Sequence, residues 1–263
     1  MNDQPLSSRA DMPAQTAWAY DHPYLFAVLL TLSQLGLAGL VLGVAPTALP
    51  GWDPIQLRII ATCTMAVVAA ALLQIFQLWG PAGFNRPSQW RENWAGWIAV
   101  LICAAPLGLG VDLPPAGEVA DLTWKMIVNS FAEEAIFRGL AIAFLLQRGG
   151  VRAVLITAFL FGSLHFMRLM FGADFGATLV QVIFASAYGI FLGALWLGTR
   201  TIWWPIIIHT LTNLLPSFAS ADLEGMTGMA FSFGSAIAGL ILAAILLRRA
   251  SSKPATRPRT GRK

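Results

Sequence analysis

Charged side chains are scarce in this sequence. The 263 residues include only 13 acidic and 17 basic ones, so 11% of the chain is charged, 57% is hydrophobic, and the mean hydropathy is +0.67. A soluble domain carries about a quarter of its residues as charged side chains, and this chain has too few to cover a water-facing surface. The composition also excludes a disordered protein and a disulfide-rich secreted domain. It predicts a polytopic membrane protein.

Long apolar runs are abundant. A helix needs roughly 20 residues to cross about 30 Å of hydrocarbon, and the runs lack the two-residue alternation of barrel strands. The predicted fold class is therefore all-α: a polytopic transmembrane helical bundle of about eight spans, in which Pro106 and Pro205 blur the ends of the third and seventh. The predicted spans are Tyr24–Val44, Ile59–Trp79, Trp94–Val111, Leu122–Leu146, Val154–Met170, Ala177–Leu197, Ile202–Phe218 and Met229–Leu247.

The sequence contains no repeat and no soluble domain, so we expect one integral membrane domain over residues 1–263. Its predicted parts are a polar N-terminal segment (1–23), a motif-bearing core (121–218) and a basic disordered tail (248–263). Cys63 and Cys103 lie in apolar runs and are interpreted as small buried hydrophobic residues, which indicates neither a disulfide nor a metal site.

The basic residues predict the orientation in the membrane. With both termini in the cytoplasm, most of the lysines and arginines fall on the cytoplasmic side, and only Arg58 and Arg168 fall in outer loops. This bias is the one that the positive-inside rule requires. The net charge of +4 then reflects topology, so we expect the lipid bilayer and no nucleic acid as a partner. In a bacterial cell, the location would be the inner membrane.

Ionisable residues inside a span are costly and indicate a functional site by default. At 1.5 Å per residue, the polar groups of three spans lie about 10–16 Å from the ends of those spans. We therefore expect them to meet at one level of the bilayer. They are Glu133, Glu134 and Arg138 on the fourth span, His165 on the fifth, and His209 and Asn213 on the seventh.

The spacing within these spans suggests different roles. Glu134 precedes Arg138 by four residues, which is the favourable order for a helical ion pair. Glu133 is turned by about 100° around the helix and has no visible partner there, so it is a candidate general base or acid. His209 and Asn213, also four residues apart, share one face and can donate hydrogen bonds to a common oxyanion.

Three motifs in this order carry a resemblance to a known family. Glu133-Glu134-x-x-x-Arg138 followed by Gly139, then Phe161-x-x-x-His165, then His209-x-x-x-Asn213, resemble the motifs of the CPBP intramembrane proteases. That family includes the type II CAAX prenyl endopeptidases and the Abi, or bacteriocin-immunity, proteins. Each motif alone is weak, whereas three in order on separate helices are specific. The first three spans and the last match only as generic apolar helices.

The resemblance implies an all-helical membrane endopeptidase whose glutamate and histidine activate a water molecule. Glu133 would be the general base, and His165 would position or deprotonate the water. His209 and Asn213 would stabilise the oxyanion that forms on the peptide carbonyl. The substrate would be a peptide or a membrane protein, with a prenylated CAAX protein as the class that defines the eukaryotic branch.

The resemblance also implies that Glu134 and Arg138 support the helix and tune the site. The cofactor is left open. Glu133, His165 and His209 are a three-ligand set of the kind that binds zinc with an open position, and the family is often labelled as metalloproteases. A metal-free glutamate mechanism is also argued for it, and Asn213, which suits a donor role better than ligation, favours that alternative.

Two other classes of protein compete with a peptidase. A secondary transporter could use mid-membrane glutamate, histidine and asparagine residues as a proton or substrate relay, although the sequence shows no repeat and no paired broken helices. A non-catalytic scaffold or immunity protein would keep the polar cluster only for folding. Substitution of Glu133 separates the scaffold from the other two classes, because only the scaffold would keep its phenotype, and substrate flux in proteoliposomes would indicate a transporter.

Overall fold

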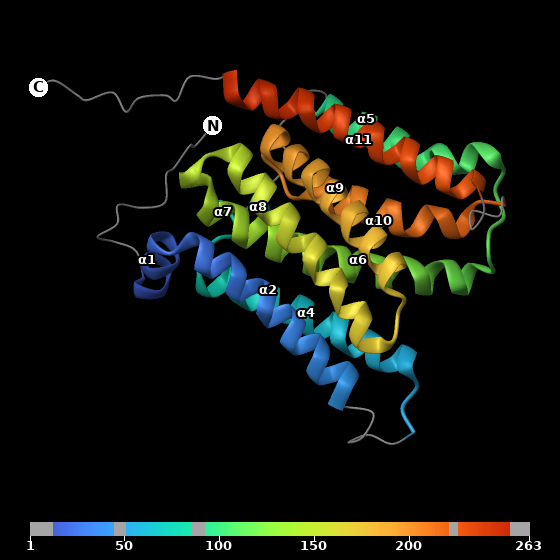
Figure 1. Cartoon of the computed structure of the whole chain (residues 1–263), viewed down its shortest axis with the longest axis horizontal. Coiled ribbons are helices and arrows are strands. Elements are labelled where there is room, and N and C mark those ends of the chain that lie inside the picture. Colours follow the sequence, from blue (N-terminus) through green and yellow to red (C-terminus); the bar gives the residue numbers. More distant parts are fainter. Residues whose placement is uncertain (1–12, 45–50, 86–92, 221–225, 253–263) are drawn as a thin grey trace, which may run out of the picture.

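The computed structural model describes residues 13–44, 51–85, 93–220 and 226–252. Within these ranges the regular secondary structure is helical, and extended pairing is limited to an isolated bridge between Val111 and Ala219. The helices lie alongside one another in a bundle (Figure 1). The predicted all-α class is confirmed.

The helical segments follow one another with short connections, and several α-helices continue directly into π or 3-10 turns. The N-terminal half contains α1 (Ala14–Asp21), α2 (Pro23–Gly39), the π-helix η2 (Leu40–Val44), α4 (Pro54–Ile75), α5 (Trp94–Ala104) and the 3-10 helix η4 (Ala105–Leu109). The second half contains α6 (Ala116–Glu134), the π-helix η5 (Ala135–Ala141), α7 (Ile142–Leu145), η6 (Leu146–Arg148), α8 (Gly150–Ser163), the 3-10 helix η7 (Leu164–Phe171), α9 (Phe175–Thr199), α10 (Trp203–Leu214), η8 (Leu215–Phe218) and α11 (Met226–Ser252).

Five segments of the described chain are long and apolar enough to cross a membrane. They correspond to the first, second, fifth, sixth and eighth predicted spans, while the third forms a shorter apolar helix. The fourth and seventh predicted spans are helical but do not meet the same criterion, so the number of eight stays a prediction. The five segments are Pro23–Gly43, Ile55–Ile75, Gly150–Phe171, Phe175–Thr199 and Phe233–Ser251.

Two predicted boundaries are wrong. The second span ends at Ile75, before the predicted Trp79, because the chain turns at Gln77, where φ is 56°. At the other end of the chain, α11 continues to Ser252, so the first residues of the predicted disordered tail are helical. The remainder of that tail, 253–263, lies outside the described residues.

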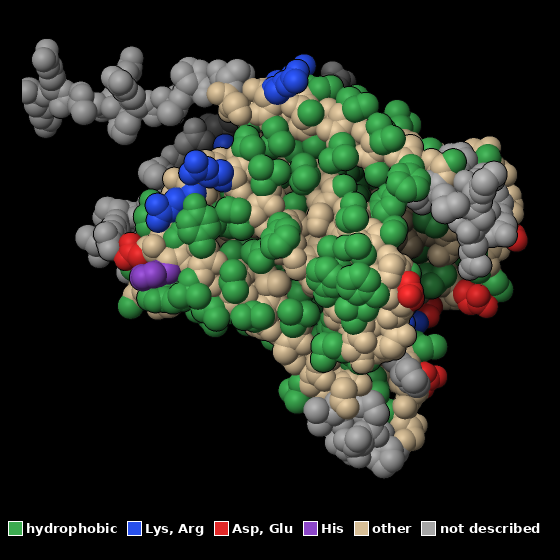
Figure 2. All heavy atoms as spheres, viewed as in Figure 1, with side chains coloured by type: hydrophobic (Ala, Val, Ile, Leu, Met, Phe, Trp, Pro, Cys, Tyr) green, Lys and Arg blue, Asp and Glu red, His purple; other side chains and the backbone are tan. Residues whose placement is uncertain are grey.

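Charge is distributed unevenly along the bundle. On the face drawn in Figure 2, lysine and arginine gather at one end, most acidic side chains gather at the other, and apolar side chains cover the surface between. Both α1 and the end of α11 lie at the basic end (Figure 1). This arrangement agrees with the positive-inside rule, and the cytoplasmic location of both termini stays a prediction.

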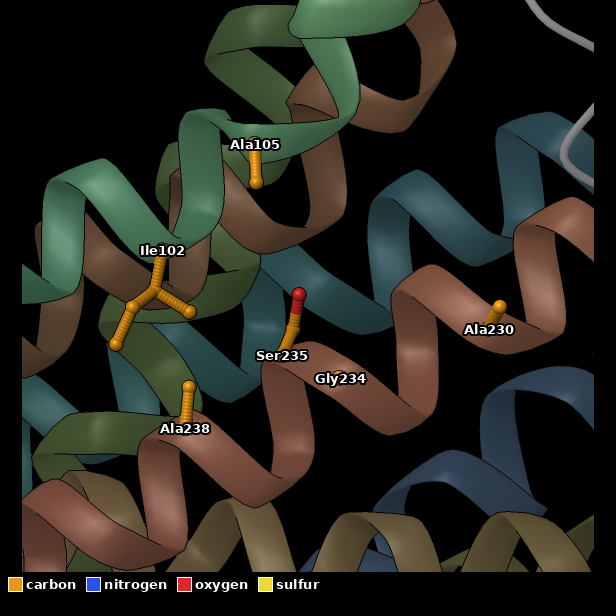
Figure 3. Close-up of a pocket in the computed structure, with 6 residues that line it drawn as sticks. All are labelled: Ile102, Ala105, Ala230, Gly234, Ser235 and Ala238. Carbon is orange, nitrogen blue, oxygen red and sulfur yellow. The ribbon is translucent and has the colours of Figure 1, made fainter.

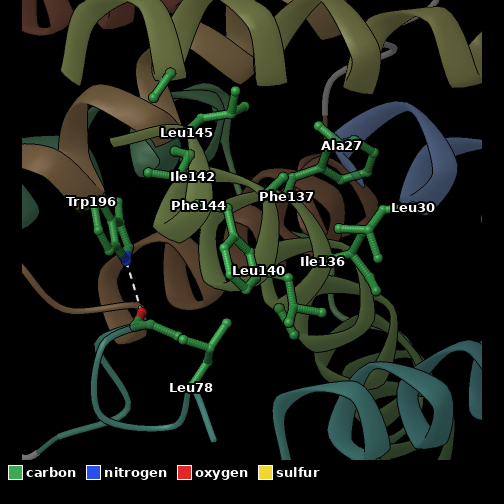
Figure 4. Packing of buried hydrophobic residues seen from close by; sticks show 14 of the residues in the cluster. Ala27, Leu30, Leu78, Ile136, Phe137, Leu140, Ile142, Phe144, Leu145 and Trp196 are labelled. Atoms are coloured by element: carbon green, nitrogen blue, oxygen red, sulfur yellow. Dashed lines mark hydrogen bonds between the residues drawn. The ribbon is translucent and has the colours of Figure 1, made fainter. Parts of the chain in front are cut away.

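The segment η5 forms the centre of the bundle. All seven of its residues are buried, because α2, α4, α8 and α9 pack around it. Figure 4 shows Ile136, Phe137 and Leu140 of this segment within the apolar core, together with Leu30 of α2 and Trp196 of α9. A helix that is buried on every side belongs to a protein interior.

The sequence predicts a regular helix here, whereas the structure has a π-helix directly after Glu134. Such turns are rare and occur frequently at functional sites. The residues Ala135–Ala141 of this π-helix are all buried against the surrounding helices. Among these residues is Arg138, whose side chain is completely buried.

Glycines bring α8 and α9 unusually close together. A Cβ atom at Gly189 would lie 2.9 Å from the Cα of Ala158, and one at Gly162 would lie 2.8 Å from the Val182 carbonyl oxygen. Both positions therefore require glycine for the helices to approach at this distance. The contact holds the end of α8, and with it His165, against the helix that contacts Arg138 and His209.

Candidate active site

His209 lies between the two glutamates of α6. Its Nδ1 atom is 2.7 Å from Glu134 Oε1, and its Nε2 atom is 3.6 Å from Glu133 Oε2. A carboxylate only accepts, so His209 Nδ1 donates to Glu134. The longer separation exceeds the range of a hydrogen bond and leaves Nε2 facing Glu133 across a short gap. The two helices α6 and α10 thus bring their polar groups to one level, as the sequence predicts.

Glu134 and Arg138 form an ion pair in the interior. Arg138 Nη1 donates to Glu134 Oε1 at 2.9 Å, and both side chains are 0% exposed. Arg138 also donates from Nη2 to the Gly189 carbonyl at 3.3 Å, and its guanidinium lies 4.7 Å from the centre of the Phe161 ring. Because Glu134 Oε1 also accepts from His209, this carboxylate orients a site histidine in addition to pairing with Arg138.

The prediction that Glu133 has no partner within its own helix is wrong. Asn129 Nδ2 donates to Glu133 Oε1 at 3.3 Å from one turn earlier, and His209 faces the other oxygen. The Glu133 side chain is 21% exposed, whereas that of Glu134 is fully buried. The spacing of four residues between Asn129 and Glu133 could have revealed this contact, since it equals that of Glu134 and Arg138.

His165 lies on η7, and its Nδ1 atom is 3.3 Å from the Phe161 carbonyl oxygen. A carbonyl accepts only, so Nδ1 carries the proton, and Nε2 of the neutral ring is left as an acceptor. The Phe161 ring contacts both imidazoles, with centroid separations of 5.5 Å to His165 and 6.0 Å to His209. Phe161 therefore links the two histidines, and within the described residues His165 forms no ion pair with either glutamate.

Asn213 lies one turn beyond His209 on α10, which is helical over both residues. The two residues therefore share a face of this helix, as the spacing predicts. Unlike His209, Asn213 is exposed. Its amide has no hydrogen-bond partner in the part of the chain that the structure describes, which leaves it available to another molecule.

The residues named as zinc ligands are not gathered into a metal site. Across the described ranges, no group of three or more histidine, cysteine, aspartate or glutamate side chains could hold a metal ion. Glu133 and His209 face each other, whereas His165 is hydrogen-bonded to a backbone carbonyl and packs edge-to-face against Phe161. This arrangement of the three side chains does not fit a resident metal.

Sequence reasoning missed three residues beside His209. The Tyr188 ring lies 5.6 Å from the imidazole, and its hydroxyl donates to Thr212 Oγ1 at 2.8 Å. Cys103 is buried as predicted, but its sulfur also contacts Thr212 Oγ1 at 3.2 Å. Tyr188 could have been noticed, because tyrosine is most frequent at membrane interfaces and this one lies within a predicted span.

A separate cavity of about 370 Å³ lies between the end of α5 and α11 (Figure 3). Its lining includes no predicted site residue. On α11, Ser235 lines the cavity, while Gly239 packs against Phe191 of α9, because a residue without a side chain lets the two helices approach closely. The residues lining the cavity are Ile102, Ala105, Ala230, Gly234, Ser235 and Ala238.

Long apolar helices around a buried cluster of glutamate, histidine and arginine define the class of this protein. It is an integral membrane protein with a polar site inside its helical bundle.

Residues 115–215 match the family described as Type II CAAX prenyl endopeptidase Rce1-like. This match confirms the family that the three motifs predict, and it supports an intramembrane protease at the level of the family. The matched segment extends from the start of α6 to the end of α10 and contains all six predicted site residues. It gives no support to the Abi or metalloprotease-like descriptions. No curated protein matches the chain.

Proposed function

We propose that this protein is an intramembrane endopeptidase in which Glu133 activates a water molecule to attack a peptide carbonyl. The observation that carries the proposal is the orientation of His209, whose Nδ1 is held by Glu134 while Nε2 faces Glu133. An imidazole oriented by one carboxylate and facing a second is suited to moving protons during hydrolysis. A transporter or a scaffold does not require this arrangement.

Glu133 is the general base in this proposal because its side chain is the more accessible of the two glutamates. The water oxygen forms a bond to the carbonyl carbon as Glu133 takes a water proton, and the carbonyl oxygen becomes an oxyanion. The C–N bond then breaks, and Glu133 returns the proton to the leaving amine. The products are a carboxylic acid and an amine, and Glu133 is again ionised.

Glu134 and Arg138 act through His209. Arg138 neutralises Glu134 in the interior, and Glu134 fixes the proton of His209 on Nδ1. This hydrogen bond changes the expectation from sequence, because Nδ1 is already used by Glu134. His209 therefore donates to the oxyanion only from Nε2, and only as the imidazolium, in which both ring nitrogens carry a proton. Asn213, exposed and one turn away, is the proposed second donor.

His165 is proposed to orient the attacking water. Its Nε2 atom is the acceptor of the ring, since Nδ1 faces the Phe161 carbonyl. Phe161 contacts both histidine rings and Arg138, so this aromatic side chain sets the spacing between the water-binding and oxyanion-binding sides of the site.

The proposed substrate is a prenylated CAAX peptide held in the bilayer. The family description names this class, and a site surrounded by apolar helices suits a substrate with a lipid group. No soluble cofactor takes part in the proposed steps.

The experiment is cleavage of a farnesylated CAAX peptide by the purified protein in lipid nanodiscs, with the released AAX fragment measured by mass spectrometry. We expect Glu133→Gln to lower kcat by about 10²–10⁴-fold without a change in melting temperature. Glu118→Gln is the matched control, because Glu118 is an exposed glutamate in the first turn of the same helix. Absence of cleavage by the wild type, or full cleavage by Glu133→Gln, would contradict the proposal.

A further inference from the structure

A chain of hydrogen bonds connects three helices beside His209. Tyr188 on α9 donates its hydroxyl to Thr212 Oγ1 on α10, which lies 3.2 Å from Cys103 Sγ on α5. The same sulfur is 3.9 Å from the carbonyl oxygen of Ile208. This series of hydrogen bonds therefore ends at Ile208, the residue that precedes His209 in the sequence.

The protons of this chain can be assigned from what each group is able to do. The Ile208 carbonyl accepts only, so the Cys103 thiol donates to it. Tyr188 donates to Thr212, and the proton of Thr212 is then directed to Cys103 Sγ. Each hydrogen is used once and in one direction, so the loss of a single hydroxyl interrupts the whole chain.

The Tyr188 ring extends along the face of α10 that carries His209. Its centroid is 5.6 Å from that of the imidazole, the two planes meet at 81°, and its hydroxyl reaches Thr212 three residues further on. The next residue on α9, Gly189, accepts a hydrogen bond from Arg138. Tyr188 and Gly189 are consecutive residues of α9. They therefore contact His209 and Arg138, the two side chains that donate to Glu134.

We propose that Tyr188 is a positioning residue for His209. Its ring holds the imidazole so that Nε2 faces Glu133, and the bonds through Thr212 and Cys103 hold the ring. The kinetic part of this inference rests on the proposed peptidase function. Because a displacement of about 1 Å at a reacting centre can cost about 100-fold in rate, a smaller loosening of His209 lowers kcat. Tyr188 makes no proposed contact with substrate, so KM is unchanged.

The test uses substitutions that conserve shape. Tyr188→Phe keeps the ring and removes the hydroxyl, Thr212→Val removes the hydroxyl from a side chain of equal size, and Thr212→Ser retains it. We expect the first two to lower kcat for the farnesylated CAAX peptide about 10-fold at unchanged KM, and Thr212→Ser to restore the wild-type value. The double variant Tyr188→Phe/Thr212→Val should be no slower than the slower single variant, because both substitutions remove the same hydrogen bond between Tyr188 and Thr212.

Thr64→Val is the matched control, since within the described residues the Thr64 hydroxyl donates only to the Ile60 carbonyl of its own helix, at 2.7 Å. It should leave kcat unchanged. Wild-type kcat in both Tyr188→Phe and Thr212→Val would overturn the inference. A lower melting temperature with unchanged kcat per folded molecule would overturn it too, since that result indicates a purely structural role.

A second measurement does not depend on peptidase activity. NMR of protein labelled with ¹⁵N-histidine reports the ring of His209, which is assigned by its loss in His209→Gln. Tyr188→Phe and Thr212→Val should shift these resonances, and Thr212→Ser should leave them in place. If the wild type fails to cleave but the resonances respond in this way, the proposed function fails and the positioning of His209 stands. Unchanged resonances in both variants would overturn the positioning role itself.

Discussion

The continuous helix formed by α6 and η5 carries two ion pairs of identical spacing in very different surroundings. Near its N-terminal end, Lys125 pairs with Asp121, and these side chains are 25% and 50% exposed. Where the helix enters η5, Arg138 pairs with Glu134, and both are 0% exposed. Water can replace the partner of either group in the first pair, whereas the second pair has only protein around it.

The comparison shows that the consequence of an ion pair depends on burial more than on spacing. An exposed pair is screened by water and contributes little. Removal of one member of a buried pair leaves an uncompensated charge in the interior. The buried pair is also connected further, because Glu134 accepts from His209 and Arg138 donates to the Gly189 carbonyl.

The largest effect is expected from Glu134→Gln. The substitution leaves Arg138 charged in the interior and removes the acceptor of His209, so we expect the free energy of unfolding to fall by about 3–5 kcal/mol. Thermal unfolding in nanodiscs, followed by near-ultraviolet circular dichroism, measures this change.

The double variant Glu134→Gln/Arg138→Met is the control for that substitution. It removes both charges, so it should recover much of the lost stability, while peptide cleavage stays low because His209 is no longer oriented. Wild-type stability in Glu134→Gln alone would break the comparison between the two pairs.

A smaller loss of stability is expected from Gly189→Ala, at a place where two helices pack closely without a buried charge. Gly189→Ala would place a Cβ atom 2.9 Å from Ala158 Cα, so α8 and α9 must separate at a cost of about 1–3 kcal/mol. Gly36→Ala is the matched substitution on the exposed side of α2, where nothing lies within 4 Å, and helix propensity favours it by up to about 1 kcal/mol. Equal melting temperatures for the two variants would show that this close approach does not limit stability.

Gln34 tests the reverse situation, a buried polar group that lacks a partner. Its side chain is 2% exposed on α2, and neither polar atom has a hydrogen-bond partner within the described ranges. Replacement by leucine, which is apolar and of similar size, should raise the free energy of unfolding by about 1 kcal/mol. A lower melting temperature for Gln34→Leu would indicate that the amide is satisfied in the membrane.

The smallest effect is expected from Asp121→Asn. The hydrogen bond from Lys125 holds the pKa of Asp121 below its ordinary value, so any stabilisation is present at neutral pH and is lost as the pH falls through the lowered pKa. Because half of the Asp121 side chain is exposed and water screens its pair with Lys125, the change in melting temperature should be undetectable at pH 7 and should stay so at acidic pH. A clear destabilisation at pH 7 that vanishes in acid would contradict this expectation.

Much of this architecture can be predicted from sequence because apolar runs and intramembrane charges are strong signals. The helices of the three motifs, the Glu134–Arg138 pair and the common level of Glu133 and His209 follow from hydropathy and from helical spacing. The sequence does not show that Glu133 contacts both Asn129 and His209, since a spacing pattern does not distinguish an exposed position from a buried one. Tyr188 escaped notice because its contact with His209 joins two helices whose relative rotation no local pattern specifies.

The π-helix at the centre of the bundle has a consequence for the phase of the long helix that contains it. One residue beyond an α-helical turn rotates all later side chains by about 100° relative to an uninterrupted helix. The part before η5 presents one face to α10 and α4, and the part after it presents another to α2 and α8. Deleting one residue between Ala135 and Ala141 would give a regular α-helix in which the two halves are no longer rotated relative to each other. That helix could pack correctly against α10 and α4 or against α2 and α8, but not against both pairs at once.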